Sequence, residues 1–379
     1  MGRNIVVCCD GTANQFDQNN TNVVKLYAAL VDDAARQLIF YHPGVGTMEA
    51  PGALTSWGQR ATIFAGMAVG YGLERDITAA YTFIMNNYKA SEGDRLFLFG
   101  FSRGAYTVRA IASLLRSCGI LRPGHETLIP YAIRLMNAIG TKGGRTREYF
   151  RLVARFKRIF AASSCKPYFV GVWDTVASVG WINNPLKIPY TANNADIQIS
   201  RHAIALDERR GFYRPNLWRP GEDAARSGPK DLKQVWFAGI HGDVGGGYPE
   251  TESGLSKIAL RWMLREAEAT GLLVDASRRD AVIAAGQGPD PDGRMHDELA
   301  AHLYWRLLEH VPKYHYDYAT KTESLRANDS RPRWLPPGSL IHESVFQRAG
   351  YTPRLPPDHV VSHDLPAAVP QRGALGGVE

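Results

Sequence analysis

The sequence predicts an α/β fold in which a mainly parallel sheet is covered by helices on both faces. Short apolar runs alternate along the chain with segments whose apolar residues recur at helical spacing. Strands separated by helices favour parallel pairing with helices on both sides. Because the carboxyl ends of parallel strands lie at one edge of a sheet, the polar and glycine-containing loops after these runs are expected to converge there. The clearer runs lie at 5–9, 38–41, 96–99, 168–173 and 235–240.

The segment LFLFGFSRGAYTVRA, residues 96–110, carries the strongest chemical signal. Its first part is a strand run, and from Ala105 the apolar residues adopt helical spacing, so the chain turns from strand to helix around Ser102. Gly100 and Gly104 flank that serine where side chains would obstruct a sharp turn. This G-x-S-x-G pattern is typical of the nucleophile elbow of an α/β-hydrolase. A serine that only caps the following helix is the alternative.

A serine hydroxyl becomes a good nucleophile only when a base removes its proton, and a carboxylate must orient that base. In α/β-hydrolases these residues follow in the order serine, acid, histidine. Asp243 follows the fifth apolar run in GIHGDVGGGY, and His342 lies in the last apolar segment. We therefore predict Ser102, Asp243 and His342 as the catalytic triad, with a helix-capping or turn role as the alternative for Asp243. Asp174 also follows a strand after the serine and is the alternative acid, and His241 is expected to support the loop or line the pocket.

The oxyanion of a tetrahedral intermediate needs backbone N–H donors. One is expected to be the amide of Arg103, directly after the nucleophile. The second is expected from Gly11 or Thr12, in the loop after the first strand. Asp10 in the same loop would shape it by hydrogen bonding or act as a further functional carboxylate.

A single domain is expected over residues 1–352, followed by a poorly ordered tail at 353–379 that is rich in proline, glycine and alanine. The short run at 339–341 fits an edge strand or a strand end. Three segments are too long for simple crossovers and are expected to form helical insertions that cap the sheet edge. They lie at about 120–165, 180–232 and 250–335.

The 379 residues are 45% hydrophobic and 21% charged, which excludes bulk disorder and allows a sizeable core. The formal net charge of +7 is spread along the chain except at 142–158, where basic residues alternate with aromatic and aliphatic ones. That pattern indicates an amphipathic basic helix, for which a solvated face is the simpler interpretation and a membrane- or nucleic-acid-binding face the alternative.

The four cysteines show no C-x-x-C or zinc spacing, so neither a disulfide framework nor a metal site is expected. The N-terminus runs directly into the first strand without room for a signal peptide, and no apolar stretch approaches the roughly 20 residues that span a bilayer. We therefore expect a soluble protein that is cytoplasmic as synthesised, with non-classical export as an alternative.

Seven motifs in order resemble an uncharacterised α/β-hydrolase family that includes the catalytic domain of type VI secretion phospholipase effectors. The resemblance covers about residues 3–350 and implies a serine esterase mechanism, phospholipase A activity, and Ser102, Asp243 and His342 as the triad. We expect no delivery module within these residues. The motifs are CCDGTANQ, YHPGVGT, GFSRGAYTVRA, GVWDTVASVG, RHAIALDERRGFYRPNLW, WFAGIHGDVGGGY and IHESVFQR.

Two other classes of function stay open at this point. One is a metal-dependent phosphoesterase with Asp10, Asp174, His241 and Asp243 as ligands, although the loop after Asp10 lacks the second aspartate of aspartyl-phosphate phosphatases. The other is a binding module that keeps the hydrolase fold without catalysis. No P-loop and no G-x-G-x-x-G after a strand supports nucleotide binding.

The expected partner is an ester or lipid substrate, with transient contact to a membrane surface, no cofactor and no nucleic acid. The sequence makes no prediction of oligomeric state, acyl chain or head group. Apolar residues of the second insertion would line an acyl pocket or form the core of the insertion itself: Trp181, Ile182, Leu186, Ile188, Phe212, Tyr213 and Trp218.

Overall fold

The computed structural model describes residues 2–11, 19–44, 67–139, 147–176, 180–181, 184–185, 188–219, 228–317, 320 and 322–365. Within these ranges no helix is both long and apolar enough to cross a membrane.

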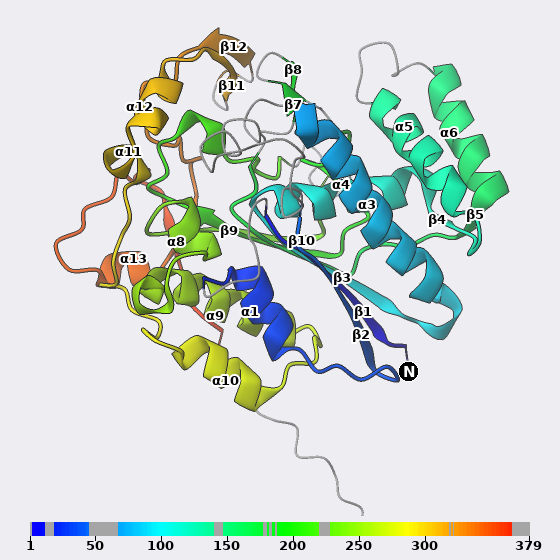
Figure 1. Cartoon of the computed structure of the whole chain (residues 1–379), viewed down its shortest axis with the longest axis horizontal. Coiled ribbons are helices and arrows are strands. Elements are labelled where there is room, and N and C mark those ends of the chain that lie inside the picture. The colour runs from blue at the N-terminus through cyan, green and yellow to red at the C-terminus, as the bar shows by residue number, and fades with distance from the viewer. Residues whose placement is uncertain are drawn as a thin grey trace, which may run out of the picture.

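An eight-stranded sheet forms the centre of the described chain (Figure 1). Its strands are β1 (Asn4–Cys9), β2 (Gln37–His42), β3 (Arg95–Phe101), β6 (Phe169–Trp173), β9 (Ile199–Ala205), β10 (Asp231–Phe237), β13 (Leu340–His342) and β14 (Val360–Ser362). They lie in the order β14-β13-β10-β9-β6-β3-β1-β2, and each neighbouring pair is parallel. The predicted α/β fold with a parallel sheet is confirmed.

The strand register brings the loops that follow β3, β6 and β10 to one edge of the sheet. Phe101 lies opposite Trp173, and Cys9 on β1 lies opposite Gly100. Further along the sheet, Ala205 at the end of β9 pairs with Phe237 at the end of β10. Parallel strands that end in step therefore place the following residues side by side, as the sequence predicted.

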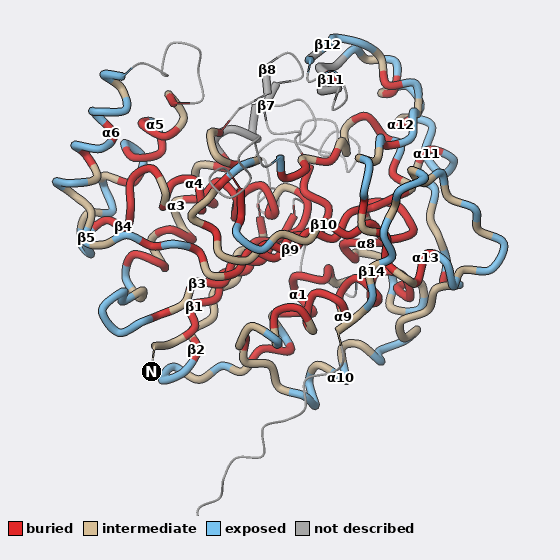
Figure 2. Tube along the Cα trace, turned by 180° about the vertical axis from the view of Figure 1, so that it is seen from behind, coloured by how far each residue is buried: buried red, intermediate tan, exposed pale blue. Residues whose placement is uncertain are grey.

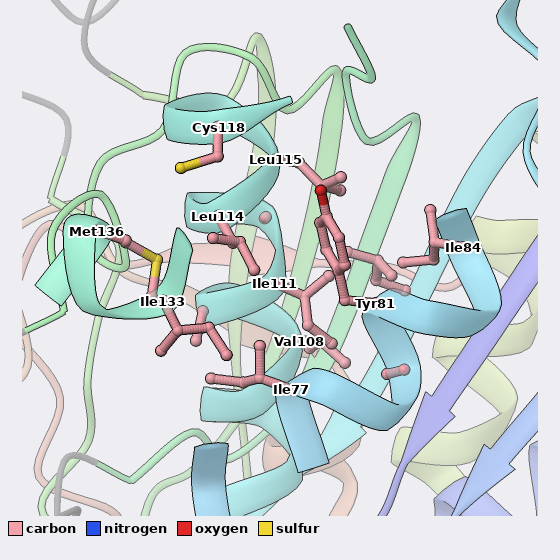
Figure 3. Close-up of a cluster of buried hydrophobic side chains, with 14 of the residues drawn as sticks. Ile77, Tyr81, Ile84, Val108, Ile111, Leu114, Leu115, Cys118, Ile133 and Met136 are labelled. Atoms are coloured by element: carbon pink, nitrogen blue, oxygen red, sulfur yellow. The ribbon is translucent and has the colours of Figure 1, made fainter. Parts of the chain in front are cut away.

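Four helices that share a large apolar core lie on one side of the sheet; the first two contact its strands, and the other two pack against those helices. They are α3 (Met67–Asn87), α4 (Ser102–Cys118), α5 (Ile129–Ile139) and α6 (Arg147–Phe160). Figure 3 shows α4 between α3 and α5, with Ile111 and Leu114 of α4 among side chains of both neighbours. Burial of these side chains stabilises the sheet on the side where α4 begins at Ser102.

The opposite face is covered by α1 (Asn22–Ala29) and α9 (Gly254–Glu268), and α10 (Ala276–Ala284) packs against these two helices. Figure 2 shows that α9 and the central strands β1, β3, β6 and β9 are almost entirely buried. Two aromatic side chains of the sheet, Phe99 and Trp173, pack in this core against Met263 and other residues of α9.

The remaining elements are short. The helices are α8 (His241–Gly245), α11 (Glu298–Ala301), α12 (Leu303–Glu309) and α13 (Ser344–Gln347), with 3-10 turns η1 (Ala90–Glu92), η2 (Glu126–Leu128), η3 (Gly211–Tyr213) and η4 (Glu250–Glu252). The minor strand pairs are β4 (Ile120–Leu121) with β5 (Ala161–Ser163), β7 (Gly180–Trp181) with β8 (Asn184–Pro185), and β11 (Lys313–Asp317) with β12 (Thr322–Arg326).

Two of the predicted cap insertions contain parts of the central fold. The segment 180–232 contributes β9, a full strand between β6 and β10, and 250–335 contributes α9, which covers a face of the sheet. The strand signal of β9, ISRHAIA, is weakened by Arg201 and His202, both of which are buried with polar partners. Those polar residues hid the strand from pattern analysis.

The expected poorly ordered tail is also corrected in part. Residues 360–362 form the edge strand β14, paired in parallel with β13, so 339–341 does not mark the sheet edge. Asp364 then accepts hydrogen bonds from Arg261 and Arg265 of α9. Residues 366–379 lie outside the described residues.

Candidate active site

Ser102 occupies a turn that few residues other than glycine adopt. Its φ is +57°, and it lies directly between β3 and α4. A Cβ at Gly104 would lie 2.1 Å from the carbonyl oxygen of Cys9, and one at Gly100 would lie 2.5 Å from that of Gly104. Such a strained backbone costs about 1–3 kcal/mol and is concentrated at functional sites. Among the described residues, the Ser102 hydroxyl makes no hydrogen bond, so it does not cap α4.

Asp174 is a fully buried carboxylate at the end of β6, also with a positive φ, of +35°. Arg333 donates to both of its oxygens, at 2.6 and 2.9 Å, and the N–H of Ala205 donates to Oδ1 at 3.0 Å. The other oxygen also lies 2.5 Å from Nδ1 of His241. A two-pronged guanidinium pair of this kind fixes the orientation as well as the charge of a carboxylate.

His241 is the first residue of α8 and is held from several sides. Its backbone N–H donates to Glu208 at 3.2 Å, and its ring lies between Phe101 (centroids 4.6 Å apart) and Tyr213 (4.5 Å). Its Nδ1 is paired with Asp174, and among the described residues its Nε2 makes no hydrogen bond. Nδ1 therefore fixes the orientation of the imidazole, and Nε2 has no hydrogen-bond partner in the described part of the chain.

A glycine allows α8 to approach the turn at Ser102. A Cβ at Gly245 would lie 1.9 Å from the ring of Phe101, which immediately precedes Ser102. Only a residue without a side chain lets α8 pack this closely. As a result the ring of His241 contacts Phe101, although β10 and β3 are separated by β9 and β6 in the sheet.

The two residues predicted to complete the triad each bind other partners. The Asp243 carboxylate lies 2.6 Å from Nδ1 of His296 and accepts from the N–H of Ile240, at the start of α8. His342 is fully buried and uses both ring nitrogens elsewhere, on Asp364 (3.2 Å) and on Ser344 (2.8 Å).

The structure therefore does not join Asp243 to His342. Asp243 takes the helix-capping role that the sequence left as its alternative. His342 stacks on Phe237 of the neighbouring strand at 4.6 Å and ties β13 to the segment after β14.

Of the predicted oxyanion residues, Arg103 lies in the first turn of α4, where backbone N–H groups have no acceptor within the helix. The N–H of Gly11 donates to its neighbour Asp10 at 2.6 Å, and Thr12 lies outside the described residues. Asp10 also accepts from Thr21 (2.6 Å) and so shapes its loop.

The four ligands considered for a metal are not gathered at one point. Asp10 and Asp243 bond to Thr21 and His296, whereas Asp174 pairs with His241 and Arg333. Among the described residues, the group of three that could hold an ion is elsewhere, at His342, Glu343 and Asp364. Asp364 there already accepts from two arginines, which offset its charge.

Two residues of the site, Arg333 and Glu208, escaped sequence analysis, whereas Tyr213 was predicted as a pocket residue. Glu208 binds the backbone N–H of His241, while Tyr213 contacts the His241 ring and its carbonyl accepts from Arg333. Glu208 and Tyr213 belong to the motif RHAIALDERRGFYRPNLW, which held the available signal. Arg333 comes from a proline-rich loop that shows no pattern.

The other aromatic and aliphatic residues of the predicted pocket lie in different parts of the structure. Ile188 and Trp218 are buried in the core on the α4 side, so they serve the insertion itself. Phe212 packs near Trp305 with ring centroids 6.1 Å apart. The side chains of Trp181, Ile182 and Leu186 lie outside the described residues.

Burial and charge act in opposite directions on the two central groups. Burial by itself would raise the pKa of Asp174, but Arg333 and His241 outweigh it and hold that pKa well below its usual value. For His241 burial has the largest effect and lowers the pKa below 6.5, against the pull of Asp174. Since Arg333 already offsets the carboxylate charge, we expect the imidazole to stay neutral.

A family described as "T6SS, Phospholipase effector Tle1-like, catalytic domain" matches residues 3–266. The chain belongs to this family. The family resemblance predicted from the motifs is thereby confirmed.

Among curated proteins, the chain is similar to the uncharacterised protein YEL023C of Saccharomyces cerevisiae. The two are 31% identical over 229 residues, which is 58% of this chain and 33% of the yeast protein. The chain thus spans a third of the length of that relative.

Two solved structures are also similar. The crystal structure of an uncharacterised protein from Pseudomonas aeruginosa matches with 20% identity and a TM-score of 0.45, over 76% of this chain and 49% of that one. The structure of the Tle1 effector bound to the VgrG spike of the type 6 secretion system matches with 13% identity and a TM-score of 0.42, over 88% and 92%.

The close approach at Gly104 yields a direct prediction. Gly104→Ala should lower the free energy of unfolding by about 3 kcal/mol, because the new methyl group meets backbone carbonyls that cannot move freely. Urea denaturation measures the loss. Gly288→Ala is the matched control, since a Cβ there meets nothing within 4 Å, and it should change stability by less than about 0.5 kcal/mol. Equal effects of both changes would contradict the tight turn.

Proposed function

We propose that this protein is a serine hydrolase of carboxylic esters, of phospholipase A type, with Ser102 as nucleophile, His241 as base and Asp174 as acid. The observation that carries the proposal is the 2.5 Å pairing of Asp174 with Nδ1 of His241, beside the strained turn at Ser102. The three residues keep the chain order serine, acid, histidine of α/β-hydrolases. Membership of a phospholipase effector family supports the ester class.

In the proposed reaction, Ser102 Oγ attacks the ester carbonyl carbon while Nε2 of His241 takes its proton. His241 then gives that proton to the departing alcohol, which leaves an acyl-enzyme, and water activated by the same imidazole hydrolyses it. Asp174 holds the ring in the tautomer that leaves Nε2 free to accept.

No hydrogen bond joins Ser102 to His241 among the described residues. Catalytic hydrogen bonds of ligand-free enzymes are often long and tighten when substrate binds. The amide of Arg103 is the proposed first oxyanion donor, because it follows the nucleophile at the start of α4. Gly11 or Thr12 stays the proposed source of the second, although the Gly11 N–H would have to leave Asp10 first.

The nucleophile and its partners can be tested together. Ser102→Ala should abolish labelling by a fluorophosphonate and lower kcat for p-nitrophenyl esters by at least about 10³-fold, because triad members act as a unit. Asp174→Asn and His241→Ala should cause similar losses in kcat.

Asp243→Asn and His342→Gln are matched controls, since they change the same residue types outside the proposed triad. They should retain far more activity than Asp174→Asn and His241→Ala, with stability measured in parallel because both residues are buried. If His342→Gln were as inactive as Ser102→Ala while His241→Ala stayed active, the triad would be Ser102, Asp243 and His342.

The lowered pKa of His241 predicts the pH profile. Because the pKa of this imidazole is lowered from 6.5, the acid limb of the kcat/KM profile should lie at a pH below 6.5. Arg333→Gln would leave the Asp174 charge uncompensated, which favours protonated His241 and should move the acid limb to higher pH.

Arg333→Lys keeps the positive charge and should return the limb toward the wild-type position. Ester hydrolysis followed from about pH 4 to 9 measures all three proteins. A folded Arg333→Gln protein with an unmoved acid limb would show that Arg333 has only a structural role.

Substrate class is tested with p-nitrophenyl esters of graded length. For a lipid-type site, kcat/KM should rise over the first several carbons, since each buried methylene contributes about 0.8 kcal/mol. Phospholipid vesicles should also release free fatty acid. A strict preference for acetyl esters without fatty acid release would indicate a small-ester hydrolase instead.

A further inference from the structure

Helix α6 is strongly amphipathic in an unusual way. Its inner side, with Val153 and Phe156, is buried in the core on the α4 side and contacts α5. Its 14 residues carry five basic side chains and one acidic side chain, Glu148. That excess of positive charge makes up more than half of the +7 of the whole chain.

The arginines of α6 lie together on its outer side. Arg147, Arg151, Arg155 and Arg158 are all exposed and recur at helical spacing, so they form a continuous ridge. None of the four makes an ion pair with any residue in the described part of the chain. Their charge is thus uncompensated, in contrast to the buried arginines of the fold, such as Arg201 and Arg333.

Large apolar side chains flank this ridge in place of polar ones. Phe150, Leu152 and Ile159 are each 43–44% exposed, and so is Tyr131 on the adjacent helix α5, beneath the exposed Arg134. Figure 2 shows α6 at the margin of the molecule with its outer side exposed. Water solvates the unpaired arginines well, but exposed aromatic and aliphatic groups at such density are typical of an interaction surface.

We propose that the outer side of α6, with Tyr131 and Arg134 of α5, is a docking surface for anionic phospholipid membranes. The arginines would contact phosphate groups of lipid heads, while Phe150, Leu152, Ile159 and Tyr131 enter the interfacial region. The helix lies along the surface, anchored to the protein through Val153 and Phe156.

A nucleic acid would also match the charge of the arginine ridge. Its phosphates give no reason for aliphatic side chains beside the arginines, because Leu152 and Ile159 offer neither charge nor a stacking surface. A lipid interface uses both kinds of group at once. The choice of a membrane agrees with the proposed phospholipase activity and rests on it in that respect only.

Binding is tested without catalysis. The full chain carrying Ser102→Ala is sedimented with vesicles of phosphatidylcholine containing about 30% phosphatidylglycerol, at low and high salt. Arg151→Glu with Arg158→Glu should weaken partitioning by about 25-fold or more, because each basic group near an anionic surface contributes about fivefold. Leu152→Ser with Ile159→Ser should weaken the binding that persists at high salt.

The matched control is Lys230→Glu with Arg354→Glu, which changes the net charge equally at exposed positions away from α6. It should bind nearly as wild type, and circular dichroism confirms that all variants are folded. Equal loss in both pairs, or equal binding to pure phosphatidylcholine, would overturn the proposal. Binding of an oligonucleotide that depends on α6, with vesicle binding that does not, would replace the membrane with nucleic acid.

The measurement separates this surface from the proposed activity. Vesicle binding that depends on α6, in a protein without esterase activity, would support the surface and reject the function. Fatty acid release that is unaffected by the α6 changes would support the proposed function and reject the docking surface.

Discussion

Compensation of one buried charge organises the proposed site. Asp174 is fully buried at the end of β6, and an isolated carboxylate there would be prohibitively unstable. Arg333 supplies the opposite charge through two hydrogen bonds, Ala205 supplies a backbone donor, and the His241 ring makes a further contact. These partners come from β9, α8 and a distant loop, so the charge also ties those segments to β6. The geometry that suits a catalytic acid therefore also holds the site together.

The balance within this group explains why the histidine is suited to act as a base. A carboxylate alone would strongly favour protonated imidazole, which cannot accept a proton from serine. At His241, burial outweighs the pull of Asp174 and Glu208, so its pKa lies below the usual value. A neutral ring held through Nδ1 presents Nε2 in the form that general-base catalysis requires.

The parts of the site fixed by local sequence were predictable. The turn at Ser102 depends on Gly100 and Gly104, which let the backbone approach closely, and both belong to the five-residue G-x-S-x-G motif. The sheet was likewise predictable where its strands are apolar. The tail strand β14 was missed, because it has only three residues and its partner strand β13 is also short.

The proposed acid and base rest on contacts that sequence spacing does not reveal. Asp243 and His342 satisfied chain order as well as Asp174 and His241 did, since all four lie at or just after the ends of strands of the same sheet. The two pairs differ in whether the carboxylate contacts the imidazole, and this depends on residues that are distant in the sequence. His296 takes Asp243, and Asp364 takes His342, from segments that sequence analysis placed in a cap or in a poorly ordered tail.

The strand missed at 199–205 shows how such partners depend on topology. β9 lies between β6 and β10, so the ends of those two strands are separated by two strand spacings, about 10 Å. His241 nevertheless reaches Asp174, because α8 turns back over the sheet edge and packs through Gly245 onto Phe101. The same strand ends at Ala205, whose N–H binds Asp174. β9 therefore sets the distance between β6 and β10 that α8 must span. It also helps to hold the Asp174 carboxylate, which His241 of α8 contacts.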